Sequence, residues 1–429
     1  GSSGGGGGGA GGIGGNANGG AYLGGNGGPG LASSITGTSE FYGAGGGGSG
    51  SGIGVPGAGG SGVGGSGSTT LFQPGGDAIG YGNGGGGGTS NGAGAGGSGS
   101  AGTAVLSYSS SSFTLRIASS NYSSQITGSI TGPISLSVDG SGKLILVGAN
   151  TYSGSTTINN GSTLQVGNGG SSGKFGNGSV ANNGILIFNR GNAISIANDI
   201  SGSGQIITSG SGTLTLSGNN TYTGTTTISA GTLNVTGTLS DSTAVTVDSG
   251  ATYIVGATDT VASIAGAGNI TLTGNLTAGS TPNTTFSGVM SSTGSFTKVG
   301  SGTLTLSGPN TYTGGTTINA GTLALGASDV LANTGALTVN GGTLALGGNS
   351  DTVGAVTIGS NGGSITSTTG VLTGSGYTFN NTSTATVSAV LAGSVNLTQA
   401  GSGTTTLSGN NTYTGTTTIS AGTLNVTGT

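Results

Sequence analysis

One stretch of this chain occurs twice without a single change. The sequence SGNNTYTGTTTISAGTLNVTGT fills positions 217–238 and again positions 408–429. An active site is one constellation in one place, so verbatim repetition of a polar stretch indicates architecture before it indicates chemistry. It favours a fold that grows by stacking similar units. We therefore expect a repeat protein.

The repeated stretch belongs to a longer unit that occurs four times. Its aliphatic residues alternate with small polar ones, a period of two that predicts strands with one face buried, and nothing after residue 128 has helical periodicity. The copies are GKLILVGANTYSGSTTINNGSTLQV (142–166), GTLTLSGNNTYTGTTTISAGTLNV (212–235), GTLTLSGPNTYTGGTTINAGTLAL (302–325) and GTTTLSGNNTYTGTTTISAGTLNV (403–426). The predicted inward-facing core residues are Leu144, Leu146 and Ile158; Leu214, Leu216, Ile228, Leu233 and Val235; Leu304, Leu306, Ile318 and Leu323; and Leu407, Ile419 and Leu424.

Each copy also contains an Asn-Thr-Tyr step two residues before a glycine. The tyrosines are Tyr152, Tyr222, Tyr312 and Tyr413. The position before this asparagine holds Ala149, Asn219, Pro309 or Asn410, and a site that accepts proline is a corner and not the interior of a paired strand. Aromatic rings outside a rod would grip sugars, but at a corner we expect these tyrosines to cover core aliphatics and fix the turn.

Short strands with small-residue corners fit a sandwich or a solenoid, and only a solenoid extends by repetition. The sequence therefore predicts an all-β, right-handed parallel β-helix over residues 128–429, continuing beyond Thr429. At roughly 20 to 25 residues per coil, about 300 residues give about 12 to 15 coils and a rod about 60 to 70 Å long.

The chain before the repeats has a different composition. Residues 1–108 form a glycine-rich region, and residues 109–127 form a Ser-rich bridge. Runs such as GGGGGG at 4–9 suit bundled polyglycine II rods of the polyproline II (PPII) type, whereas a flexible linker is the plain alternative.

Composition excludes several classes of site. The chain has no His and no Cys, which removes His-based triads, thiol nucleophiles and Cys/His zinc sites. Five scattered cations cannot bind nucleic acid, and no apolar run is long enough for a membrane-spanning helix. Asp241 and Asp248 lie close in sequence, yet single aspartates at turns are ordinarily solvated. We expect no catalytic residue, no cofactor and no metal site.

The unit GSGTLTLSGNNTYTGTTTISAGTLNV at 210–235 resembles the autotransporter passenger-associated β-strand repeat of proteins secreted by the type V route. The resemblance implies a rod-like passenger on the outer surface of a bacterium. It favours a non-catalytic structural or adhesive stalk or fibre, with surface polysaccharide, other cells or copies of itself as partners. A self-assembling extracellular filament subunit, a polysaccharide-binding or polysaccharide-cleaving β-helix and an ice-binding solenoid are the alternatives.

Overall fold

The computed structural model describes residues 31–33, 40–42, 113–118, 123–279 and 281–428. The chain divides into two compact units, residues 1–109 and residues 110–429. In the first unit the described strands are β1 (Leu31–Ser33) and β2 (Glu40–Tyr42), which pair antiparallel. The predicted polyglycine rods and the alternative linker lie outside the described residues.

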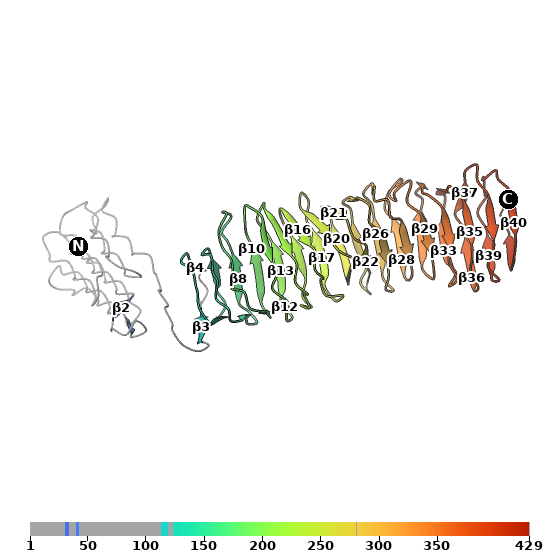
Figure 1. Cartoon of the computed structure of the whole chain (residues 1–429). Helices are drawn as coiled ribbons and strands as arrows, with labels where there is room; N and C mark the ends of the chain where they lie inside the picture. The colour runs from blue at the N-terminus through green and yellow to red at the C-terminus, as the bar shows by residue number, and fades with distance from the viewer. Residues whose placement is uncertain (1–30, 34–39, 43–112, 119–122, 280, 429) are drawn as a thin grey trace, which may run out of the picture. The chain divides into compact units, whose positions relative to one another are not determined.

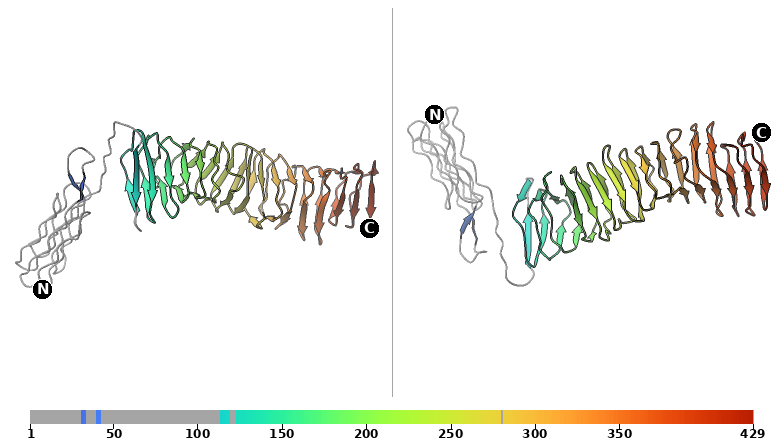
Figure 2. Two further views of the ribbon diagram at one scale, coloured as in Figure 1. Left: turned by 90° about the horizontal axis from the view of Figure 1, so that it is seen from below. Right: turned by 45° about the horizontal axis from the view of Figure 1, so that its top comes forward.

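The second unit is a parallel β-solenoid whose coils follow one another along a rod (Figures 1 and 2). No residue described in this unit is helical, so the all-β prediction is confirmed. In the described part of the chain no helix has the length and hydrophobicity needed to cross a membrane. Every strand pair of the solenoid is parallel, and each coil has up to three sides.

Side 1 is one continuous sheet of 16 strands. It consists of β4 (Ser123–Ile126), β6 (Lys143–Leu146), β8 (Thr163–Val166), β10 (Ile185–Phe188), β13 (Gln205–Thr208), β15 (Thr226–Ile228), β17 (Ala244–Val247), β20 (Ser263–Gly266), β23 (Thr284–Phe286), β26 (Thr303–Leu306), β28 (Thr322–Leu325), β30 (Thr343–Gly347), β33 (Gly363–Ser367), β36 (Thr384–Val387), β39 (Thr404–Leu407) and β41 (Thr423–Val426).

Side 2 follows side 1 in each coil and carries two separate sheets. The first contains β11 (Ile194–Ile196), β14 (Thr213–Leu216), β16 (Thr232–Val235), β18 (Thr252–Val255), β21 (Asn269–Leu272) and β24 (Met290–Ser291). The second contains β31 (Asp351–Thr352), β34 (Val371–Thr373) and β37 (Val390–Ala392).

Side 3 closes the coil and also carries two sheets. The first contains β3 (Phe113–Ala118), β5 (Ile134–Asp139), β7 (Thr156–Ile158), β9 (Val180–Asn182) and β12 (Ile200–Ser201). The second contains β19 (Asp259–Val261), β22 (Leu276–Ala278), β25 (Phe296–Lys298), β27 (Thr316–Ile318), β29 (Leu337–Val339), β32 (Val356–Ile358), β35 (Tyr377–Phe379), β38 (Leu397–Gln399) and β40 (Thr417–Ile419).

Coil length follows from the register of side 1. The number of residues per coil is the difference between two paired positions. On this side the shortest coils have 19 residues, as from Thr404 to Thr423, and the longest have 22, as from Thr163 to Ile185. Sixteen stacked strands span 15 intervals, so at about 4.8 Å each the rod is about 70 Å long. Strands β3 and β4 of the Ser-rich bridge pair with β5 and β6, so parallel pairing already begins at Phe113.

The core is a single column of apolar side chains along the axis. Most of the described strands alternate, with inward residues buried and outward residues partly exposed, as in β14 and β26. Burial against the coils above and below is what stabilises each coil, because one coil alone has no second layer to cover its apolar face.

Candidate functional site

Thirteen of the fifteen predicted core residues, all except Ile419 and Leu424, are at most 2% exposed. Leu424 is partly buried against the core. Ile419 differs from the prediction, with 55% of its surface exposed. The reason is that it belongs to the last described coil, which no described coil covers. Thr405, which replaces the first leucine of the fourth copy, is buried, and its hydroxyl donates to Asn381 Oδ1 at 3.0 Å.

The corner tyrosines point into the rod. Tyr152, Tyr222 and Tyr312 are fully buried, whereas Tyr413 in the last coil is half-buried. Each hydroxyl pairs with the threonine four residues later, as Tyr152 does with Thr156 Oγ1 at 2.6 Å. Burial raises the pKa of the Tyr222 and Tyr312 hydroxyls. The three buried rings therefore have no face available to a sugar.

The asparagine of the Asn-Thr-Tyr step connects coils, a role that the sequence analysis did not assign. Asn310 Oδ1 accepts the Met290 N–H of the coil below at 2.7 Å, and its Nδ2 donates to the Val330 carbonyl of the coil above at 2.8 Å. Asn150 makes the same pair of bonds to Ile130 and Lys174. The signal in the sequence was the presence of this asparagine in all four copies.

The glycine that ends the corner is required by close approach. A Cβ on Gly224 would lie 2.1 Å from the carbonyl oxygen of Gly204 in the coil below, and a Cβ on Gly154 would meet the Ile134 carbonyl in the same way. Stacked corners thus bring backbone directly onto backbone.

The second copy occupies different sides of the coil from the other three. In copies 1, 3 and 4 the first and last strands lie on side 1, and the corner after the first strand lies on side 2. In copy 2 those strands are β14 and β16 on side 2, and the corner at 218–224 lies on side 3. Its Thr221 N–H accordingly bonds the Ile200 carbonyl of β12. The two identical stretches therefore face different directions.

Each shift of sides interrupts a sheet. Among the described residues, no strand of side 3 lies between β12 and β19, where the chain forms the copy 2 corner and then the loop 236–243; we call residues 218–260 break 1. Side 2 likewise has no strand between β24 and β31 in the described part of the chain, where the copy 3 corner and then the loop 326–335 are formed; we call residues 308–352 break 2. Each new sheet restarts with the sequence Asp-Thr-Val, at 259–261 and at 351–353.

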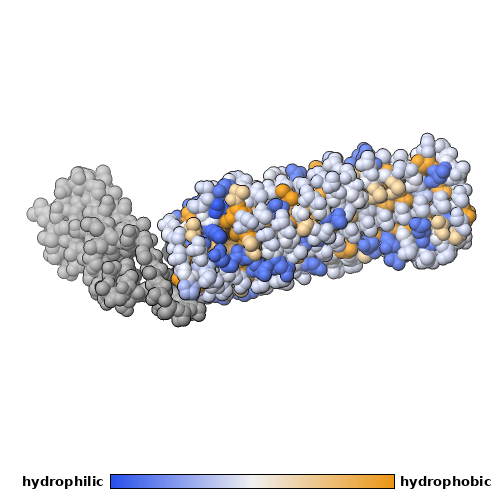
Figure 3. All heavy atoms as spheres, viewed as in Figure 1, coloured by the Kyte–Doolittle hydropathy of each residue, from blue (hydrophilic) through white to orange (hydrophobic). Residues whose placement is uncertain are grey.

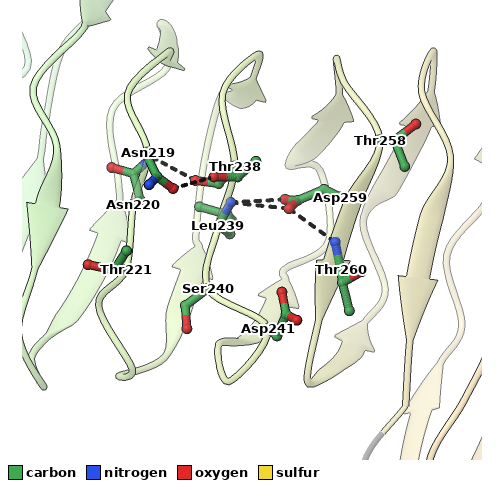
Figure 4. A pocket seen from close by; sticks show the side chains of 10 residues that line it. All are labelled: Asn219, Asn220, Thr221, Thr238, Leu239, Ser240, Asp241, Thr258, Asp259 and Thr260. Carbon is green, nitrogen blue, oxygen red and sulfur yellow. Dashed lines mark hydrogen bonds between the residues drawn. The ribbon is translucent and has the colours of Figure 1, made fainter.

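Break 1 contains a groove of about 450 Å³ lined by three successive coils, at 219–221, 238–241 and 258–260 (Figure 4). Asp259 is part of this lining, although it is only 4% exposed, and it accepts the Leu239 N–H at 3.1 Å and the Thr260 N–H at 3.0 Å. The pKa of the Asp259 carboxyl is raised to about 6, mainly because burial disfavours its charged form. The N–H donors act to lower this pKa, and the charge of Asp241 acts to raise it.

Break 2 repeats this arrangement. Asp351 is 1% exposed, and its Oδ2 accepts the N–H groups of Val330 and Leu331 at 2.9 and 3.0 Å. Burial raises the pKa of its carboxyl to about 6, and the charge of Asp329 adds to the shift. The sequence analysis missed both buried aspartates, because nothing local separates an inward Asp from a solvated one.

The aspartates singled out in the sequence do not meet. Asp241 lies in break 1 on side 3, whereas Asp248 directly follows β17 on side 1. Asp241 instead lines the same groove as Asp259.

The outward face of the nine-stranded sheet has an unbroken threonine column. In every strand of this sheet, from β19 to β40, the central residue is threonine, and register pairs these residues in sequence. They are Thr260, Thr277, Thr297, Thr317, Thr338, Thr357, Thr378, Thr398 and Thr418. We call them the threonine column. Within the described part of the chain, none of their hydroxyls has a hydrogen-bond partner.

Comparison with protein-family models gives four matches, all to the passenger-associated-transport-repeat, at residues 136–166, 206–235, 296–325 and 397–426. Each match begins one strand before the corresponding copy of the repeated unit and covers four strands. Within each match the first strand pairs with the third, and the second strand pairs with the fourth, as in copies 1 and 2. Searches of curated proteins and of solved structures gave no match. The predicted resemblance is confirmed at all four copies.

Proposed function

We propose that this chain, which carries four passenger-associated-transport-repeats of autotransporter passengers, is the non-catalytic stalk of a secreted surface protein. The observation that supports this most directly is the uninterrupted 16-stranded ladder of side 1. It joins every coil to the next over about 70 Å, so the rod resists bending and holds what it carries at a fixed distance.

The sides of the rod suit an adhesive role in addition to spacing. Most of the face drawn in Figure 3 has intermediate hydropathy, and strongly hydrophilic and hydrophobic residues lie along it in small groups. The threonine column adds nine unpartnered hydroxyls in line within the described residues, spaced by one strand interval of about 4.8 Å. Many weak contacts along such a line add up when the partner has a regular surface of its own.

The stalk proposal is tested by measuring how the rod stands on the cell. The chain has no Cys, so single cysteines at exposed positions, Ser171→Cys near one end and Thr414→Cys near the other, accept one dye each. These positions are about 12 coils apart, or about 60 Å. With the full-length protein on intact cells, energy transfer to a membrane dye should differ strongly between the two labels. Equal transfer from both would mean that the rod lies along the surface, and the stalk proposal would fail.

The proposed adhesive role of the threonine column is tested by introducing charged side chains into it. Thr317→Lys, Thr338→Lys and Thr357→Lys together place three like charges on the threonine column, and we expect them to reduce cell-to-cell or cell-to-polysaccharide adhesion at least tenfold. The matched control places lysines at three consecutive outward positions in register on side 2, namely Ser195→Lys, Thr215→Lys and Asn234→Lys. Equal loss in both variants would show that side 3 has no special role.

A further inference from the structure

Six Asn-Gly pairs lie in the described part of the rod. They are Asn160–Gly161, Asn168–Gly169, Asn177–Gly178, Asn183–Gly184, Asn340–Gly341 and Asn361–Gly362. Four more, within residues 1–108, lie outside the described residues. An asparagine before glycine loses its side-chain amide without an enzyme, because no glycine side chain hinders attack by the glycine nitrogen on the asparagine side-chain carbon. The six pairs are alike in this chemistry, so a difference in their reactivity must come from the fold.

Asn160 and Gly161 are the two central residues of a tight turn between β7 and β8. The Ser162 N–H donates to the Asn159 carbonyl at 3.0 Å, and Gly161 has a φ of 80°, which is typical of the third position of a type II turn. Both central residues are exposed. Copy 1 makes this connection with Asn-Asn-Gly-Ser, one residue more than the Ser-Ala-Gly or Asn-Ala-Gly of the other copies.

The longer turn leaves both reacting groups free. A Cβ on Gly161 would meet nothing within 4 Å, whereas a Cβ on Gly231, the corresponding glycine of copy 2, would lie 2.3 Å from the Gly210 carbonyl oxygen of the coil below. Within residues 123–279 and 281–428, neither the Gly161 N–H nor the Asn160 side chain has a hydrogen-bond partner. The nitrogen and the carbon that it attacks therefore rotate toward each other without losing a hydrogen bond of their own.

The other five pairs are held by hydrogen bonds or by packing. In four of them the glycine N–H is bonded: Gly169 donates to the Asn189 carbonyl at 2.9 Å, Gly184 to Asn182 Oδ1 at 3.2 Å, Gly341 to the Gly362 carbonyl at 2.8 Å, and Gly362 to the Gly359 carbonyl at 3.0 Å. In the fifth, a Cβ on Gly178 would lie 2.2 Å from the Gly154 carbonyl oxygen, and the Gly178 carbonyl accepts Asn198 Nδ2 at 2.6 Å.

We propose that Asn160 is a site of spontaneous deamidation in the folded rod. The Gly161 nitrogen attacks Cγ of Asn160 and closes a cyclic imide, the Cγ–Nδ2 bond breaks, and the Gly161 proton leaves with Nδ2 as ammonia. Water then opens the ring at either carbonyl and leaves aspartate or isoaspartate at position 160. The overall change converts an amide and water to a carboxylate and ammonium, so it needs no oxidant or reductant.

The turn tolerates both products. Each adds one negative charge to a chain whose formal net charge is −4, and isoaspartate also lengthens the main chain by one atom. Open space around Gly161 accommodates that atom, whereas at Gly178 it would push two stacked coils apart. The rod should therefore keep its fold after Asn160 has reacted.

Peptide mapping of the folded full chain tests the proposal. During incubation at mildly basic pH in water enriched in heavy oxygen, each deamidated peptide gains one heavy oxygen atom, and chromatography separates its aspartate and isoaspartate forms. We expect Asn160 to react about tenfold faster than each of the other five described sites, because those must first break a hydrogen bond or separate two coils. Circular dichroism should stay unchanged while the product accumulates.

Two controls separate the effect of the fold from that of the local sequence. In denaturant the six sites should react at similar rates. In the folded chain, Asn160→Ala, which introduces the alanine that copies 2, 3 and 4 have at this position, should remove the fastest product and leave the other five unchanged. The proposal is overturned if another described Asn-Gly pair reacts as fast as Asn160 in the folded chain, or if Asn160 keeps the same advantage in denaturant.

Discussion

Leu216→Asp is the sharpest test of the inward and outward faces. Leu216 is fully buried on side 2, within β14, and its neighbour Thr215 points outward in the same strand. Removing the leucine side chain from the core costs about 2 kcal/mol of transfer free energy. The new carboxyl must also stay neutral inside the core. At Asp259, where backbone N–H groups help, the pKa of about 6 already corresponds to about 3 kcal/mol. Adding the two terms, we expect a loss of about 5 kcal/mol in local stability.

Hydrogen exchange measures this loss coil by coil. Amides of β14 and of its partners β11 and β16 should exchange more than a thousandfold faster. This factor follows because about 1.4 kcal/mol corresponds to a tenfold change in an equilibrium constant. Coils several turns away should be unaffected, since each contacts only its neighbours.

Thr215→Asp is the matched control and should change exchange by less than tenfold, because its side chain points outward. Similar acceleration in the two variants would refute the assigned faces. Acceleration along the whole rod would refute the coil-by-coil picture.

Three further predictions concern the corner and the breaks. Gly224→Ala should lower the free energy of unfolding by about 1 to 3 kcal/mol in chemical denaturation, because its Cβ meets backbone, whereas Gly376→Ala, with open space around it, should be neutral. Tyr222→Phe should cost about 1 to 3 kcal/mol by leaving the buried threonine hydroxyl unpaired, and an unchanged denaturation midpoint would contradict that. The raised pKa values of the Asp259 and Asp351 carboxyls stabilise the fold below about pH 4, and this stabilisation is lost as pH rises through about 6. Each should therefore cost about 1 to 2 kcal/mol between about pH 5 and about pH 7.5, and the variant carrying both Asp259→Asn and Asp351→Asn should show a flatter profile.

Much of the fold could be predicted from local pattern. The two-residue alternation identified buried positions such as Leu144 and Ile318, because strand geometry sends successive side chains to opposite faces whatever the neighbouring coil is. The tyrosine corners were predictable for the same reason. Tyr222 and Thr226 are close in sequence, so their hydrogen bond depends only on the local path of the chain.

The buried aspartates were not predictable in that way. Asp259 and Asp351 resemble any turn aspartate in the sequence, and hydrogen bonds from N–H groups of the preceding coil, which the sequence does not show, help to make their inward position tolerable. The threonine column is intermediate. Each Thr-centred strand is visible in the sequence, but the alignment of all nine depends on coils of unequal length, short from Thr260 to Thr277 and longer from Thr317 to Thr338.

The sequence by itself determined the strand, corner and strand of each repeat, since these depend on contacts within one unit. Only the tertiary structure decided which sides the unit occupies. From Tyr152 to Tyr222 the chain makes three full turns and one further side, from Tyr222 to Tyr312 four turns and two sides, and from Tyr312 to Tyr413 five whole turns. Each unit runs once around the coil, so it can begin on any side. Its orientation is therefore set by the lengths of the intervening coils and by how they stack, not by its own residues.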